Sequence, residues 1–438
     1  MLALSSPWFL IIGLSVAISI VFLVGARLTV VRMAGLPQAL PSTRAEPWKI
    51  PMAPARQLTK TLIILALVAL SATGIGIIML RFVYGIGAVT NLSDGVPWGV
   101  WIGFDVMSGV ALAAGAFVMA ATAHIFNIRR FEPLVRPAIL TGLLGYLLVI
   151  AGLMVDLGRP YNVWRPLVHW QIHSPLWEVG CCVAIYSTVL IIEFLPVILE
   201  RVNGIKAVST RLPTVRLYRI LTRFSIIFVI MGVVLSTLHQ SSLGSLWVLV
   251  PEKLHPLWYS LYLPLFFWIS AIAVGLAMTI VESTLSSRVF KRGLEIDLLA
   301  DLAKAASVVL VIYLTAKVID LVIRDAWPWL FQPGIEAYAY WLEIGLGVIV
   351  PAILFASPTL RRRPGVLFTG ALMIVLFGVV LNRLNVSMVG LWSSSGIIYL
   401  PSWMEIVVSL TLVTLGVMAF GLAAKYLPVF EHEAPSGE

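Results

Sequence analysis

Eleven apolar runs, each long enough to cross a lipid bilayer, divide this chain of 438 residues. A spanning helix needs about 20 consecutive apolar residues. With 60% hydrophobic residues, 12% charged residues and a mean hydropathy of +0.99, the chain is too apolar for a soluble protein. The pattern therefore predicts an all-α polytopic membrane protein. The runs lie near 7–31, 59–83, 98–125, 136–157, 175–199, 217–239, 257–284, 298–323, 335–357, 364–383 and 401–425.

The connections between the runs leave no space for a separate soluble domain. The longest, 32–58, is a polar stretch that contains proline. We expect residues 1–58 to form an extra N-terminal anchor with a basic loop, 59–427 the main membrane domain, and 428–438 a polar tail. The first run has its basic residues after it and none before it, which favours an uncleaved anchor over a signal peptide.

Lysine and arginine are distributed unequally between the two sides of the membrane. One set of loops and helix ends holds 22 of them, and the opposite set holds six. Cytoplasmic loops collect positive charge, so we expect an outside N-terminus and a cytoplasmic C-terminus in a bacterial inner membrane. The same rule explains the net charge of +9 without nucleic-acid binding. The six outer residues are Arg81, Arg159, Arg165, Lys253, Arg324 and Arg383.

Tryptophan supports the same orientation. Most of the 15 tryptophans fall near the outer face, whereas Trp48 alone is clearly on the cytoplasmic side. An aromatic belt would populate both interfaces. The surplus on one side predicts that another protein docks on the outer face.

Ionisable residues inside the apolar runs are the main functional candidates. Each costs roughly 2.5–3.5 kcal/mol at membrane depth on insertion scales, so it should face the protein interior and serve a purpose. The outer half holds Asp105, Glu178, His239, Lys317, Asp320, Glu343 and Glu405. The cytoplasmic half holds His124, Glu193, Glu282, Asp301 and Lys304.

Several of these residues also have structural explanations. Lys317 and Asp320 are three residues apart and can form an ion pair on one helix face. Asp301 and Lys304 can do the same at the cytoplasmic interface, or simply extend their charged ends to the membrane surface. Glu178 and Glu405 are shallow enough to be solvated. Asp105 lies inside an otherwise apolar run, which makes it the strongest functional candidate. Carboxylates with a histidine suit proton-coupled transfer to a small lipophilic molecule.

The sequence predicts no resident metal or haem. Cys181 and Cys182 are adjacent, whereas iron–sulfur clusters and zinc sites need more thiolates at wider spacing. Of six histidines only His124 and His239 touch the runs, at opposite faces, so a bis-histidine haem is not expected. Electrons would then pass from a partner's cofactors directly to a bound two-electron carrier.

Five sequence blocks contain unusual residues in a recognisable order and spacing. The blocks are NLSDGVPWGVWIGFD (91–105), PLVRPA (133–138), TLHQSSLGSL (237–246), KLHPLW (253–258) and YLPSWMEIVVS (399–409). Together they resemble the membrane subunit of Hyb-type periplasmic nickel–iron hydrogenases, in the NrfD/polysulfide-reductase membrane-subunit family. The match covers about residues 60 to 427, and the first run is the departure from it.

The resemblance implies two antiparallel four-helix bundles with peripheral helices, and no haem or iron–sulfur cluster in this chain. It implies menaquinone or ubiquinone bound near the outer face. A periplasmic iron–sulfur subunit would dock there, followed by the hydrogenase small and large subunits. Asp105, Glu178 and His239 would be the quinone and proton residues, with Trp98 and Trp101 as apolar walls. Gln240 and Ser241 would extend the hydrogen bonds of His239 to the quinone. A proton path to the cytoplasm would use Glu193, Glu282 and His124.

These observations predict the membrane subunit of a respiratory oxidoreductase that connects a periplasmic iron–sulfur protein to the quinone pool. A first alternative keeps the quinone reaction and replaces the hydrogenase with a multihaem cytochrome or another periplasmic oxidoreductase. A second alternative is a secondary transporter, which would use intramembrane carboxylates and glycine-interrupted helices. A transporter places its ionic residues near the midplane, whereas here they gather in the outer half.

Overall fold

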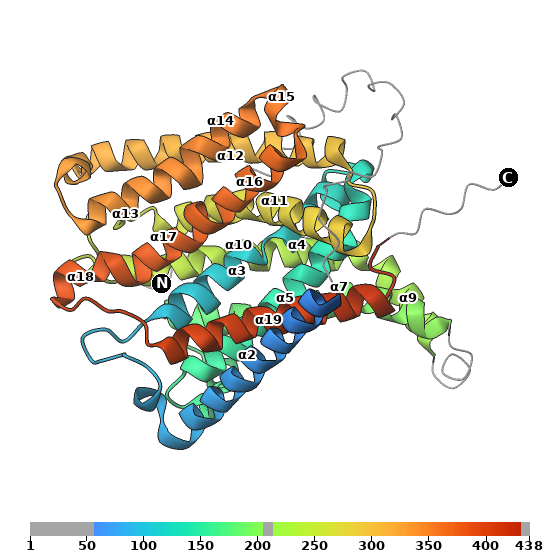
Figure 1. The fold of residues 1–438 in the computed structure, drawn as a ribbon, viewed down its shortest axis with the longest axis horizontal. Helices are drawn as coiled ribbons and strands as arrows, with labels where there is room; N and C mark the ends of the chain where they lie inside the picture. The colour runs from blue at the N-terminus through green and yellow to red at the C-terminus, as the bar shows by residue number, and fades with distance from the viewer. Residues whose placement is uncertain (1–56, 205–212, 431–438) are drawn as a thin grey trace, which may run out of the picture.

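The computed structural model describes residues 57–204 and 213–430, and this part of the chain is almost entirely helical (Figure 1). Ten helical segments in it are long and apolar enough to span a membrane. The eleventh expected span, 7–31, lies outside the described residues. The ten segments are Ile64–Tyr84, Trp101–Ile125, Arg129–Asp156, Pro175–Asn203, Ser225–Val248, Leu263–Phe290, Ile296–Ile323, Ile335–Ala356, Pro364–Ser395 and Trp403–Tyr426.

Four neighbouring segments pack into a first antiparallel bundle. Small residues allow the close approach: a Cβ on Gly142 would lie 2.4 Å from the Cβ of Ala116. Membrane helices associate through such small-residue contacts because lipid supplies no hydrophobic drive between them. The members are the segment Trp101–Ile125, α5 (Glu132–Asp156), α7 (Pro175–Asn203) and α10 (Ser225–Val248).

The next four segments form a second bundle beside the first. Its closest backbone contact is at Gly347, where an added Cβ would lie 2.2 Å from the amide nitrogen of Gly378. Helix α11 also packs against the first bundle, along α10 and α4 (Gly115–Ala120). The members are α11 (Leu263–Phe290), α12 (Ile296–Ile323), α13 with α14 (Ile335–Ala356), and the segment from α16 to α18 (Pro364–Ser395).

Two helices from opposite ends of the described chain lie side by side at the edge of the first bundle (Figure 1). These are α2 (Gln57–Tyr84) and α19 (Trp403–Tyr426), and α19 also packs on α5. A capping box starts α19: the Ser402 hydroxyl accepts from the Glu405 amide, and the Glu405 carboxylate accepts from the Ser402 amide. The two packed bundles with an outer helix pair agree with the expected architecture.

Five stretches of the bundles are π-helical. The wider turn shifts every following side chain around the helix, and such turns occur frequently at functional sites. Four of them gather where the two bundles meet or inside the second bundle. The five are η2 (Trp101–Ser108), η3 (Ala121–Ile125), η7 (Gly345–Ile349), η8 (Ile374–Val380) and η9 (Asn385–Val389).

Two predicted span boundaries were wrong, and both errors concern functional candidates. The run expected at 217–239 is a short helix, α9 (Thr214–Arg223), followed by α10, which continues to Val248. His239 is therefore nine residues inside the helix, about 13 Å from its end at 1.5 Å per residue. The run expected at 364–383 continues to Ser395, so Arg383 is buried within a span and not at its outer end.

Candidate functional site

Asp105 lies on η2 and is 8% exposed. Its Oδ2 accepts a hydrogen bond from the Ser409 hydroxyl of α19 at 2.6 Å. On the α5 side, Gly152 lets the helix approach closely, because a Cβ there would lie 2.9 Å from the Asp105 Cβ. The carboxyl group is thus enclosed by η2, α5 and α19 and has one hydroxyl partner.

A buried arginine occupies one of the helix ends that the charge count assigned to the outer side. Arg81 is 4% exposed and lies in the last turn of α2. Its Nε donates to the carbonyl of Val155 at 2.5 Å, and its Nη2 donates to the carbonyl of Leu157. The guanidinium therefore caps the C-terminus of α5, where free carbonyls attract a cation. Asp156 ends the same helix, and its Oδ1 has no hydrogen-bond partner.

Glu405 is buried and not solvated, and it joins the loop before η2 to the loop before α19. It is 1% exposed, and its Oε2 accepts from the Asn91 amide at 3.0 Å. The Tyr399 hydroxyl donates to its Oε1. Burial and this hydrogen bond raise the pKa of Tyr399, which lies in the loop before α19. The Trp101 indole donates to the Glu405 carbonyl at 3.2 Å, so Trp101 joins η2 to α19.

His239 is fully buried on α10. Its Nδ1 forms a hydrogen bond of 2.8 Å with the Tyr146 hydroxyl, and the Tyr146 ring meets Tyr186 edge-on at 4.6 Å between centroids. The Nε2 of His239 has no partner. When Tyr146 donates to Nδ1, the proton sits on Nε2, which is then a free donor. An unpaired buried polar group costs about 1–3 kcal/mol, so the unpaired nitrogen suggests that a ligand supplies the missing hydrogen bond.

Two further unpartnered polar atoms lie on the same helix, between His239 and its outer end. Gln240 donates through Nε2 to the Val110 carbonyl at 3.0 Å, but its Oε1 has no partner. The Trp247 indole nitrogen also has none, and its ring meets Trp98 edge-on at 5.2 Å. Ser241 donates back to the Thr237 carbonyl within the helix at 2.8 Å. Trp98 thus belongs to the His239 side of the bundle, and Ser241 already uses its proton.

The described contacts do not join Asp105 and His239 directly. Asp105 packs at Gly152 of α5, and His239 bonds to Tyr146, six residues earlier on the same helix. Six residues correspond to about 9 Å along an α-helix and about 240° around it. The two candidates therefore lie on different sides of α5. Glu178, the third, is half-buried in the first turn of α7.

Two of the three residues expected along the cytoplasmic proton path have a carboxylate oxygen without a hydrogen-bond partner. Glu193 on α7 is half-buried with Oε1 unpartnered. Glu282 on α11 accepts from the Thr141 hydroxyl at 3.3 Å, and its Oε1 is unpartnered. His124 is exposed at the end of η3. The expected pair of Asp301 with Lys304 is wrong, because Asp301 forms its ion pair with Arg130 at 2.8 Å.

A further polar group occupies the second bundle, and sequence reasoning did not assemble it. Glu343 is fully buried and accepts from the indole nitrogen of Trp258 at 2.9 Å. The expected pair of Lys317 with Asp320 is wrong: Asp320 binds Arg324 at 2.7 Å, one turn later on α12. Glu343, Lys317 and Asp320 were separate candidates in the sequence, and only the fold brings their helices together with Trp258.

The described residues do not present the donor set of a metal or b-haem site. They contain no group of three or more His, Cys, Asp or Glu side chains that could hold a metal ion. Of the histidines on the described spans, His239 bonds to Tyr146, while His124 is exposed at the far end of its own span. These two cannot supply the paired axial ligands of a b haem. The absence of haem stays a prediction.

Comparison with known proteins identifies the scaffold. The family described as polysulphide reductase, NrfD, matches residues 88–393. The chain belongs to the NrfD family. It is similar to a protein of Nitratidesulfovibrio vulgaris at 41% identity, over 82% of this chain and 92% of that protein.

Two further NrfD-family relatives carry informative names. The probable Ni/Fe-hydrogenase 2 b-type cytochrome subunit of Escherichia coli is 33% identical, over 81% of this chain and 88% of its own length. The integral membrane subunit of a menaquinone reductase from Nitratidesulfovibrio vulgaris is 30% identical, over 80% of this chain and 87% of its own length. Membership of this family of membrane subunits confirms the resemblance drawn from the motifs.

Proposed function

We propose that this chain is the membrane subunit that exchanges electrons between a periplasmic iron–sulfur protein and the quinone pool. The observation that carries the proposal is the fully buried His239, whose Nε2 has no partner. The names of two relatives, a hydrogenase subunit and a menaquinone reductase subunit, support the same reaction class. The chain lies in a bacterial inner membrane with its C-terminus in the cytoplasm, as the charge distribution predicts.

The separation of Asp105 from His239 by α5 gives the two residues different tasks. His239 donates from Nε2 to a carbonyl oxygen of the quinone, whose ring lies against Trp98. Reduction of the quinone to quinol takes two electrons and two protons. Asp105, near the assigned outer surface, exchanges protons with that side, and Glu178 at the start of α7 is the second candidate for this task.

Protons from the other side follow a separate route. Glu193 and Glu282 lie on α7 and α11, on the assigned cytoplasmic side of the quinone site, and each has a carboxylate oxygen free for a further hydrogen bond. His124 is exposed where such a route would open to the cytoplasm. Turnover that uses this route is electrogenic, because proton and electron then enter from opposite sides.

The partner docks on the outer face, over the loops that precede η2 and α7 and those near 249–262 and 396–402. A nickel–iron hydrogenase with small and large subunits is the leading partner, and a multihaem cytochrome or another periplasmic oxidoreductase is the alternative. Relatives named as putative dimethyl sulfoxide reductase and selenate reductase subunits show that the family serves several enzymes.

Purification through a tag on this chain tests the partner. We expect a stoichiometric iron–sulfur subunit to co-purify in mild detergent, and iron analysis with mass spectrometry of the intact complex will detect it. A hydrogenase large subunit in the same complex identifies the leading partner. Recovery of the chain alone, with substrate-dependent transport in liposomes, would instead support a secondary transporter.

A further inference from the structure

The second bundle contains two buried cations that form no ion pair with a carboxylate. Lys317 on α12 is 3% exposed, and Arg383 on α17 (Leu381–Leu384) is 1% exposed. Among the ion pairs of the described chain, neither residue has a carboxylate within salt-bridge distance. Buried charges normally need a close partner, so these two require an explanation.

Asp320, the nearest carboxylate along the helix, is already occupied. Its Oδ2 pairs with Arg324 at 2.7 Å, and its Oδ1 accepts from the Ser260 hydroxyl at 2.6 Å. Glu343 is therefore the one carboxylate left in this group that interacts electrostatically with both Lys317 and Arg383. The group thus has three cations, Lys317, Arg324 and Arg383, against two carboxylates, Asp320 and Glu343, an excess of one positive charge when all are ionised.

Glu343 is held as an anion would be held. Its Oε1 accepts from the Asn382 amide nitrogen at 2.7 Å. Its Oε2 accepts from Trp258 Nε1 and from Asn385 Nδ2, both at 2.9 Å. Three neutral N–H donors replace the water that would otherwise solvate the carboxylate. Glu343 is therefore a fixed group in this cluster.

Arg383 is fixed as well. Its Nη2 donates to the Ser270 hydroxyl at 2.8 Å and to the Phe267 carbonyl at 3.2 Å. Its Nη1 donates to the side-chain oxygen of Asn382 at 2.5 Å, and its guanidinium carbon lies 3.6 Å from the centre of the Phe267 ring. A guanidinium is effectively never deprotonated in proteins. Arg383 thus contributes a permanent charge.

Lys317 is the remaining group whose charge can change. Its Nζ lies 4.9 Å from the Phe266 ring centre, 5.8 Å from that of Tyr340 and 6.0 Å from that of Tyr313. A contact with an aromatic face stabilises a buried ammonium less than an ion pair with a carboxylate would, so Lys317 can lose its proton more easily. The titratable and charged groups around Lys317 are Tyr313, Asp320 and Arg324 on α12, Tyr340 and Glu343 on α13 and Arg383 on α17, while α11 contributes the neutral Phe266.

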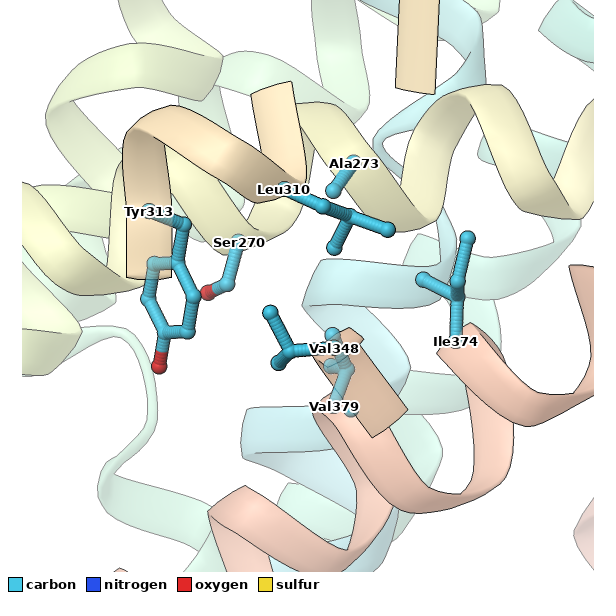
Figure 2. Close-up of a pocket in the computed structure, with 8 residues that line it drawn as sticks. Ser270, Ala273, Leu310, Tyr313, Val348, Ile374 and Val379 are labelled. Atoms are coloured by element: carbon cyan, nitrogen blue, oxygen red, sulfur yellow. The ribbon is translucent and has the colours of Figure 1, made fainter. Parts of the chain in front are cut away.

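A small cavity adjoins this cluster (Figure 2). Its volume of ≈ 10 Å³ is at the lower limit for one water molecule and far too small for a quinone, and its exposed surface is apolar. Ser270, whose hydroxyl also binds Arg383, borders it together with Tyr313, which neighbours Lys317. Figure 2 shows apolar side chains, among them Leu310 and Val348, on its other sides.

The cavity lies on the cytoplasmic side of the cluster in the proposed orientation. Leu310 is two turns before Lys317 on α12, and Ile374 and Val379 precede Arg383 on their segment. Beyond them the bundle continues toward the cytoplasmic end with Ser307, which binds the Ala352 carbonyl at 2.8 Å. A water molecule that enters this apolar cavity transiently would therefore stand between the cytoplasm and the buried cations.

We propose that Lys317 is the proton-loading group of a second transfer site, separate from the quinone and supplied with protons from the cytoplasmic side through this cavity. The step is a proton exchange with water, in which Lys–NH₃⁺ and H₂O interconvert with Lys–NH₂ and H₃O⁺. Loss of the proton removes the excess charge from the cluster, with Glu343 and Arg383 unchanged.

A direct packing contact connects this site to the helix that carries Asp105. Segment η2 packs against α17 and η9. At Gly103, two residues before Asp105, an added Cβ would lie 2.3 Å from the Ser387 hydroxyl. Because Gly103 brings η2 directly against Ser387 and Leu384, we expect a shift at Asp105 to reach the helix that holds Asn382, Arg383 and Asn385. This inference rests on the proposed quinone reaction as the source of energy.

The test uses the purified complex in liposomes that contain a trapped pH dye. Membrane-impermeant reduced viologen reaches only complexes whose partner faces outward, so the cytoplasmic face of these complexes lies toward the lumen. A short-chain menaquinone analogue is the acceptor. We expect wild-type turnover to make the lumen alkaline. In Lys317→Met this proton uptake per electron should fall to at most the one proton per electron that the quinone itself consumes through the Glu193–Glu282 route, with quinone reduction retained. Lys304→Met, on the same helix and half-buried, is the matched control and should behave as wild type.

Two further variants separate proton loading from a structural charge. Lys317→Arg keeps the cation and cannot release its proton, so uptake should fall as far as in Lys317→Met. Val348→Ile adds one methyl group at the cavity and should lower proton uptake without removing any charge. Wild-type uptake in Lys317→Met, or recovery in Lys317→Arg, would overturn the inference. An absence of quinone reduction in the wild-type complex would instead refute the proposed function.

Discussion

Replacing Asp105 with asparagine is expected to abolish most quinone-linked electron transfer while the complex stays assembled. The two side chains have nearly the same volume, and the Ser409 hydroxyl can donate to the asparagine oxygen as it does to Asp105 Oδ2. A neutral amide is also cheaper to bury than a carboxylate. Loss of the titrating group removes acid–base assistance, which is typically worth about 10²–10⁴ in rate. Quinone reduction should therefore fall by at least an order of magnitude.

The control for this variant is electron transfer from the partner to a soluble dye, which bypasses the quinone and should be nearly unchanged. Asp325→Asn is a matched substitution at an exposed carboxylate whose φ of 53° asparagine tolerates, and it should have wild-type activity. Wild-type quinone turnover in Asp105→Asn at acid, neutral and alkaline pH would make Asp105 structural. Glu178 would then be the leading proton donor.

Substitutions at His239 should separate hydrogen bonding to the quinone from packing. Glutamine keeps a side-chain N–H donor, and leucine has a similar size but no donor. We expect His239→Leu to lose quinone-linked turnover by more than about tenfold, with a higher KM for the quinone analogue, because the carbonyl loses its donor. His239→Gln should retain more of the quinone-linked turnover and have a KM closer to that of the wild type.

Thermal unfolding in detergent provides the structural comparison for these two variants. Leucine removes the unpartnered Nε2 but also takes away the Nδ1 partner of the buried Tyr146 hydroxyl, so the two effects oppose each other and His239→Leu should unfold close to the wild-type temperature. Equal loss of activity in the leucine and glutamine variants would show that His239 acts through packing with Tyr146. The free nitrogen would then need another explanation.

The helices were predictable because lipid imposes a strong rule: a spanning segment must be a long apolar helix. The ten described spans follow ten of the eleven apolar runs, and the motifs identified the family. Boundaries near His239 and Arg383 failed for a physical reason. Apolar residues continue past the polar block after His239, and a buried arginine interrupts the run that holds Arg383, so hydropathy alone places both ends too early.

The arrangement of the polar residues was less predictable than the helices. Spacing suggested that Lys317 pairs with Asp320, but the three-residue rule takes no account of Arg324, which is one turn further and forms the pair. The π-helical turns rotate Asp105 and the residues after Glu343 away from the positions that a regular α-helix gives them. Arg81 could have been noticed as a lone arginine at the end of an apolar run, because such residues cap helix ends.

The central claim is that electrons pass from a periplasmic iron–sulfur subunit through this chain's quinone site. The most direct measurement is the reoxidation of the partner's reduced clusters by a menaquinone analogue, followed by stopped-flow absorbance. The complex that contains this chain should reoxidise rapidly and lose that phase in His239→Leu. The partner subcomplex without this chain should reoxidise slowly with the quinone and normally with a soluble dye. Equal quinone-dependent rates with and without this chain would contradict the account.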